Sequence, residues 1–86
     1  MYDLNVLKEK LEYCSKVPYL VIDDIGFVKA NDFIRRNVAS LILDRMDNEK
    51  RTAITSNESM TDVFDERIVN KMKEDFKMIK LDGENL

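Results

Sequence analysis

Apolar residues recur at helical spacing near the start of the chain, with charged residues between them. The apolar positions are Leu4, Leu7, Leu11 and Cys14. This spacing places them on one face of a helix and predicts an amphipathic helix over about residues 4–14. Pro18 prevents that helix from continuing, because proline has no backbone N–H to donate.

Two short apolar runs follow a different pattern and end in polar residues. Tyr19–Ile22 is continuously apolar and runs directly into Asp23 and Asp24. Such a run is typical of a strand buried on both faces of a parallel sheet. Residues 52–55 predict a second short strand, followed by Ser56 and Asn57.

A second amphipathic helix is expected between these strands. Asn31 or Asp32 is a suitable N-cap, and Asp47-Asn48 is a typical stop and turn. Its apolar stripe consists of Ile34, Val38, Leu41, Ile42 and Met46.

The last third of the chain predicts two helical segments and a third strand. Ser59 or Thr61 is expected to cap a short helical turn, and Asp65 a longer helix through about Asp75. Residues 76–81 form the third strand candidate, with a turn at 82–83.

Helices and strands therefore alternate, which predicts an α/β fold with parallel strands and a right-handed crossover. The pattern shows no internal repeat or linker, and 86 residues allow one small domain. The chain carries no apolar run near the roughly 18 residues of a membrane span. Its start lacks the features of a signal peptide, so we expect a cytoplasmic protein.

Composition narrows the possible chemistry. The chain has no histidine, which excludes a histidine base and most zinc sites. With a single cysteine, Cys14, it forms no internal disulfide. A metal would be held by oxygen ligands, which favours magnesium or calcium. The net charge of -3 is not the charge of a chain that binds nucleic acid over its whole surface.

The polar residues after the first two strands are the candidate site. The carboxyl ends of parallel strands lie at the same edge of a sheet, where ligands of open α/β sheets bind. If the two strands are close neighbours, Asp23, Asp24, Ser56 and Asn57 face one crevice. Two carboxylates beside a carboxamide predict a site for magnesium and a polarised water.

The wording of the first motif adds a resemblance. Leu20-Val21-Ile22-Asp23-Asp24 resembles the Walker B strand of AAA+ ATPases of the helicase-loader type, the DnaC/DnaI/IstB-like group. The resemblance implies that Asp23 supports the Mg²⁺ on the ATP phosphates. It also implies that Asp24 polarises the attacking water as general base.

Two further segments resemble motifs of the same family, in the family's order. Residues 52–57 are similar to the sensor 1 strand, so Asn57 takes the role of orienting water near the γ-phosphate. Residues 65–72 are similar to the box VII helix, which reaches a neighbouring subunit's nucleotide. There Arg67 is the arginine finger, with Lys71 one turn later as the alternative.

The resemblance covers nearly the whole chain and implies that residues 1–86 are the C-terminal part of an AAA+ domain. The implied fold is a three-layer, P-loop NTPase fold without its Walker A strand and loop, because no G-x-x-x-x-G-K-[ST] pattern is present. In the family, that strand lies between the sensor 1 strand and the last strand. We therefore predict weak or no ATP binding by this chain alone.

The implied partners are a replicative helicase or a transposase, with self-association through the Arg67 helix. Single-stranded DNA is a further candidate for Arg35, Arg36 and Lys29. The sequence does not separate a DNA replication loader from a transposition helper.

Other interpretations stay open for the same residues. Asp23-Asp24 is also a common strand end, Asn57 a common turn residue, and Arg67 with Lys71 a common solvated helix face. A phospho-receiver domain also begins with a strand ending in two acids, but its nearest phospho-acceptor candidate, Asp44, falls inside a predicted helix. A non-catalytic remnant or interaction fragment is the third hypothesis.

Overall fold

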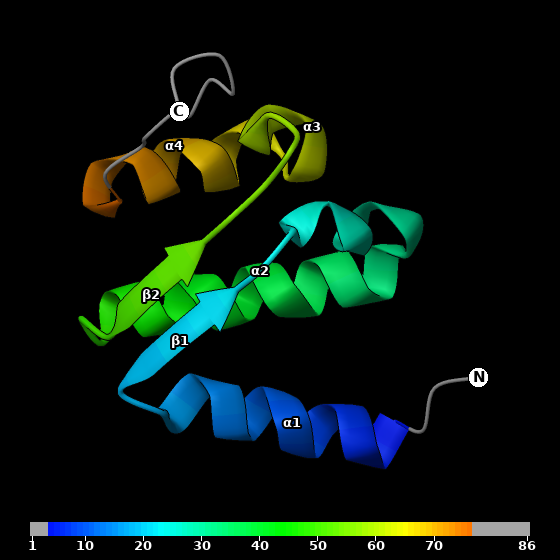
Figure 1. Cartoon of the computed structure of the whole chain (residues 1–86), viewed down its shortest axis with the longest axis vertical. Helices are drawn as coiled ribbons and strands as arrows, with labels where there is room; N and C mark the ends of the chain where they lie inside the picture. The colour runs from blue at the N-terminus through cyan, green and yellow to red at the C-terminus, as the bar shows by residue number, and fades with distance from the viewer. Residues whose placement is uncertain (1–3, 77–86) are drawn as a thin grey trace.

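The computed structural model describes residues 4–76, which fold around a central helix. Figure 1 shows two strands side by side in front of helix α2, with α1 and α4 on opposite sides. The elements in chain order are α1 (Leu4–Lys16), β1 (Tyr19–Ile22), the 3₁₀ helix η1 (Ile25–Ala30), α2 (Asp32–Asp47), β2 (Arg51–Ile54), α3 (Met60–Val63) and α4 (Glu66–Asp75).

Two predicted N-caps are confirmed by their hydrogen bonds. The Asn31 side chain accepts hydrogen bonds from the N–H groups of Phe33 and Ile34 at the start of α2. Asp65 accepts one from Ile68 at the start of α4. These bonds satisfy N–H groups that have no partner within the helix. The first helix ends at Lys16, two residues beyond its predicted end.

The strands form a parallel pair, as the alternation predicts. Tyr19 pairs with Arg51 and Ile22 with Ile54, so β2 begins one residue before the predicted strand. The third strand candidate is not tested, because residues 77–81 lie outside the described part. Phe76, its first residue, is the C-cap of α4.

The prediction that the first strand is buried on both faces is wrong. Tyr19 and Val21 are each 67% exposed, whereas Leu20 and Ile22 are half-buried on the opposite face. Helix α2 covers that second face, and within residues 4–76 no helix covers the first. We call the uncovered side, which carries Tyr19, Val21, Arg51 and Ala53, the open face. The described part thus has two layers, not three.

The hydrophobic core lies between α2, η1, α3 and α4. Ile25 and Val28 of η1, an element that the sequence did not predict, are fully buried in it. The other buried members are Val38, Ala39, Ile42, Met46, Val63, Phe64, Val69 and Met72. Because η1 follows Asp24 directly, its packing fixes the chain on both sides of the acid pair. No helix in the described part is long and apolar enough to cross a membrane.

A fully buried arginine ties α1 and β2 to the central helix. Arg45 of α2 donates to the carbonyl oxygens of Cys14 and Val17, both at 2.6 Å, and to that of Arg51 at 2.8 Å. Its Nε donates to the Thr52 hydroxyl at 2.8 Å. The charge is buried against oxygen atoms at the C-terminal end of α1, where a cation is favoured by the helix dipole.

Candidate functional site

The ends of β1 and β2 meet through Thr55. Its hydroxyl donates to the Asp23 carboxylate and accepts from the Asp24 N–H at 2.8 Å. Its backbone N–H donates to Ile22 O and its carbonyl accepts from Ile25 N–H, both at 2.9 Å. Four bonds therefore hold one residue after β2 against the whole turn that follows β1. Sequence reasoning placed Thr55 in the second strand but gave it no role in the site.

Asp24 occupies an unusual backbone conformation at this junction. Its φ of 56° and ψ of 62° are left-handed, a region that aspartate tolerates better than most residues. Its N–H is held by Thr55, and its carboxylate makes no capping bond to η1. The Asp24 side chain is exposed. The carboxylate is therefore fixed at its backbone and open to solvent.

Asn57 lies at the same edge of the sheet, two residues beyond Thr55. It is exposed, and within residues 4–76 its side chain makes no hydrogen bond. The neighbouring Ser56 instead forms a local turn, donating to Glu58 O at 2.7 Å and accepting from Glu58 N–H at 2.9 Å. The topology thus brings Asn57 to the edge that carries the acids, but the contacts to Asp23 and Asp24 come from Thr55.

An ion pair beside the acids was not predicted. Lys29 of η1 and Glu58 of the loop after β2 lie 2.7 Å apart. The hydrogen bond to Glu58, and then the attraction of its charge, raise the pKa of Lys29 above its ordinary value. A Cβ added at Gly26 would lie 2.5 Å from Glu58 Oε2 and 3.9 Å from Asp24 Oδ1. Glu58 and Asp24 therefore flank Gly26, so the edge has a third carboxylate.

The donor set at this edge consists of oxygen atoms, as a magnesium site requires. In the described part of the chain, no group of three acidic, histidine or cysteine side chains is arranged to hold a metal by itself. Mg²⁺ commonly binds through one or two carboxylates, with waters and substrate phosphates supplying the other ligands. The residues present fit that mode, in which Asp23 and Asp24 contact the waters of an ion carried by phosphates.

The two finger candidates have different surroundings on α4. Lys71 Nζ lies 3.7 Å from Asp47 Oδ1 of α2. Arg67 is exposed, and it forms no ion pair within residues 4–76. Both side chains lie on a helix that begins after Phe64, on the opposite side of the molecule from α1 (Figure 1).

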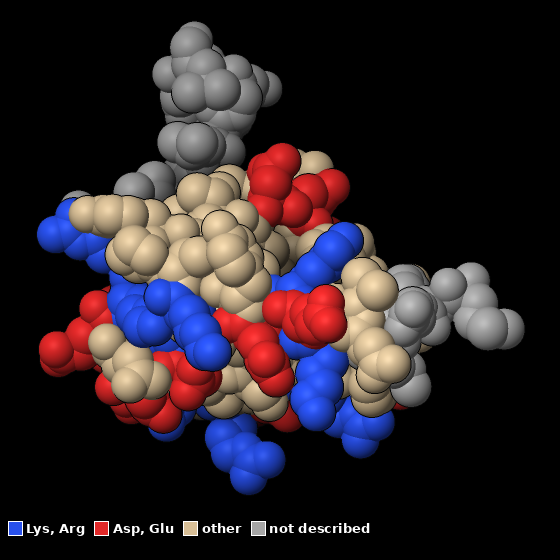
Figure 2. Space-filling model, turned by 90° about the horizontal axis from the view of Figure 1, so that it is seen from below, with Lys and Arg blue, Asp and Glu red and all other residues tan. Residues whose placement is uncertain are grey.

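Other candidate residues lie away from the strand ends. Asp44 is in the last part of α2, where its carbonyl accepts from the Asn48 side chain at 2.8 Å. Arg35 pairs with Asp32 at the start of the same helix. Basic and acidic side chains are intermingled on the face nearest α1, and Figure 2 shows no continuous basic stripe among the residues described there.

No protein-family model matches the chain, and comparisons with curated proteins and with solved structures find no significant match.

Proposed function

We propose that this chain is the C-terminal part of an AAA+ ATPase domain of the helicase-loader type, which handles Mg²⁺ and the hydrolytic water of bound ATP. The observation that carries the proposal is the bonding of Thr55 to Asp23 and Asp24. It supports a site in which a Walker B-like acid pair and a sensor-like strand act as one unit. In this site Asp23 binds the Mg²⁺ waters and Asp24 is the general base.

The parallel pairing of β1 and β2 supports the same assignment. Their register places residues 23 and 55 next to each other beyond the paired ends of the strands. Ligands of open α/β sheets bind beyond this edge. Asn57 follows Thr55 on the same side and is free to orient water.

The surroundings of α4 favour Arg67 as the residue that acts on a neighbouring subunit's ATP. Lys71 is already within ion-pair distance of Asp47, whereas Arg67 extends from the surface. A planar guanidinium also suits the charge that develops on a transferring phosphoryl group. Self-association through this helix is therefore part of the proposal.

The other partners follow from the resemblance. A replicative helicase or a transposase is the proposed protein partner, in DNA replication or transposition respectively. Single-stranded DNA is proposed for Lys29, Arg35 and Arg36, although Lys29 and Arg35 already pair with Glu58 and Asp32.

Complementation tests the proposal. A P-loop-bearing segment of a helicase-loader-type ATPase would be produced as a separate chain and mixed with this one, with Mg²⁺ and labelled ATP. We expect ATP binding that needs both chains and that weakens in Asp23→Ala. The matched control is Asp44→Ala, which removes an exposed carboxylate from α2. No gain on mixing, or equal loss in both variants, would contradict the proposal.

The finger is tested with the same mixture. Arg67→Ala should reduce ATP turnover by about 10³-fold or more, the range measured for arginine fingers, and should leave ATP binding unchanged. Lys71→Ala should have little effect on turnover. The reverse result would assign the finger to Lys71.

A further inference from the structure

The outer edge of β2 is unpaired in the described part of the chain. The sheet there contains only β1 and β2. Thr55 directs its N–H and carbonyl toward the β1 side. Because backbone groups alternate along a strand, those of Thr52 and Ile54 point away from β1. We call this side the β2 edge. Unpaired strand edges attract further strands.

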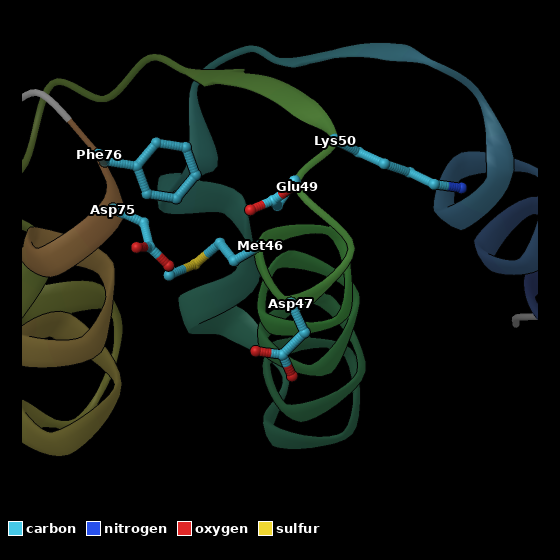
Figure 3. A pocket seen from close by; sticks show the side chains of 6 residues that line it. All are labelled: Met46, Asp47, Glu49, Lys50, Asp75 and Phe76. Carbon is cyan, nitrogen blue, oxygen red and sulfur yellow. The ribbon is translucent and has the colours of Figure 1, made fainter.

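A hollow lies where β2 begins. Its volume is about 550 Å³, and Figure 3 shows the six side chains that line it. Met46, Asp47, Glu49 and Lys50 come from the end of α2 and the turn before β2, and Asp75 and Phe76 from the end of α4. Lys50 immediately precedes the first residue of β2. The chain therefore leaves α4 close to the start of β2.

The backbone at Phe76 has already left the helical conformation. Its φ of -98° and ψ of 140° are extended, and its N–H closes α4 on Met72 O at 2.7 Å. The side chain of Phe76 is half-buried against the core. Residue 77 thus continues from an anchored, extended residue.

The handedness of crossovers indicates the side to which the chain returns. Helices α2 and α4 both pack into the core on the covered side of the sheet. A parallel crossover is right-handed in nearly all sheets. Two successive right-handed crossovers over the same face advance in the same direction. The strand after α4 therefore lands beyond β2, on the β2 edge.

We propose that the β2 edge is a docking site for residues 77–81 of the same chain, which add to it as a third parallel strand. Those residues lie outside the described part and read Lys-Met-Ile-Lys-Leu. Five extended residues span roughly 16 Å, enough to run along the four residues of β2. Docking would cover the N–H and carbonyl groups of Thr52 and Ile54.

The docking does not rest on the ATPase assignment, but it bears on it. The family resemblance places the Walker A strand between the sensor 1 strand and the last strand. In this chain that place is taken by residues 77–81, so they must leave before a P-loop-bearing segment can pair with β2. The docked segment is then a cap on the edge.

Amide hydrogen exchange on the full 86-residue chain tests the docking. The Thr52 and Ile54 amides are expected to be protected at least ~10-fold. The Ala53 and Thr55 amides, which face β1, report whether the sheet itself is intact. Nuclear Overhauser contacts between residues 77–81 and the Thr52 or Ile54 backbone are expected in the unaltered chain.

Proline variants identify the docked segment. Ile79→Pro and Lys80→Pro each remove one N–H, and only one of these two N–H groups faces β2. One variant should therefore lose the Thr52 and Ile54 protection while keeping that of Ala53 and Thr55. Glu84→Pro, beyond the segment, should lose neither.

Three results would overturn the proposal. The first is fast exchange at Thr52 and Ile54 in the unaltered chain without contacts to residues 77–81. The second is protection that persists in both proline variants. The third is protection that rises with protein concentration, which would assign the β2 edge to a second copy of the chain.

Discussion

The backbone N–H of Asp24 donates a 2.8 Å hydrogen bond to the hydroxyl of Thr55, which donates in turn to the carboxylate of Asp23. One hydroxyl therefore joins both acids of the candidate site to the neighbouring strand. Because Asp24 is in a left-handed conformation, this bond also holds the backbone from which its carboxylate extends.

Replacing Thr55 by valine keeps the shape of the side chain and removes the hydroxyl. We expect a loss of about 1 kcal/mol in the free energy of unfolding, the usual contribution of one hydrogen bond. The amide of Asp24 should exchange faster with solvent. Thr55→Ser, which keeps the hydroxyl, is the matched control and should stay close to the unaltered chain. Equal exchange at Asp24 in both variants would show that the hydroxyl does not hold the turn.

Arg45 is expected to be the most sensitive position for stability. Its four hydrogen bonds join the end of α1 and the start of β2 to α2. Arg45→Ala leaves these acceptors without a partner and opens a cavity, so we expect a loss of at least ~3 kcal/mol. That is a large part of the stability of a small domain. Urea unfolding measures the loss.

Arg36→Ala is the control for Arg45, because Arg36 is an exposed arginine on the same helix. Its effect should stay within about 0.5 kcal/mol. Equal effects of the two variants would contradict the role of Arg45. Arg45→Lys keeps the charge without the planar fork of donors, so it should be intermediate.

The fold could be predicted where a local pattern decides the structure. Asn31 and Asp65 occupy N-cap positions that their side chains recommend, and the apolar run at residues 19–22 forms a strand as expected. The exposure of Tyr19 and Val21 could not be predicted, because it depends on which elements cover the sheet and not on the strand's own residues.

The contacts of the site were less accessible from the sequence. The parallel topology places residues 23, 24 and 57 at one edge, as expected. Thr55 and Glu58 were missed because their partners, Asp23 and Lys29, lie about 30 positions away along the chain. The burial of Arg45 was missed for the same reason. An arginine in an amphipathic helix has no local signal that it will meet carbonyl oxygens from α1 and β2.

The Lys29–Glu58 ion pair predicts a change in titration. Glu58→Gln should lower the pKa of Lys29 toward its ordinary 10.5, because Glu58 is the main cause of the raised value. The pair stabilises the fold fully below pH 10.5, and that contribution is lost as the pH rises through the higher pKa of the folded chain. Nuclear magnetic resonance titration of the Lys29 side chain measures the shift. An unchanged pKa in Glu58→Gln would contradict the assignment.

Gly26→Ala tests the same contact from the other side. The new methyl group would meet Glu58 Oε2 at 2.5 Å, so the carboxylate must move. We expect a lower pKa for Lys29 and little change in stability, because exposed ion pairs contribute about 0–1 kcal/mol. Ala30→Gly in the same 3₁₀ helix does not add a methyl group at Gly26, and it should leave the pKa unchanged.

Calorimetry with Mg²⁺ and ATP checks the consequence of the missing phosphate loop. The chain alone should show no micromolar affinity, because no P-loop backbone is present to bind the phosphates. Micromolar binding by the purified chain would mean that it binds nucleotide in a way unrelated to AAA+ ATPases.

The central claim is that Asp24 activates the water that hydrolyses ATP in a completed domain. The most direct measurement compares ATP binding and turnover for the Asp24→Asn chain and the unaltered chain, each combined with a P-loop-bearing segment. Retained ATP binding with turnover reduced by at least ~100-fold is the predicted result, within the range of general-base effects. Unchanged turnover in Asp24→Asn would contradict it.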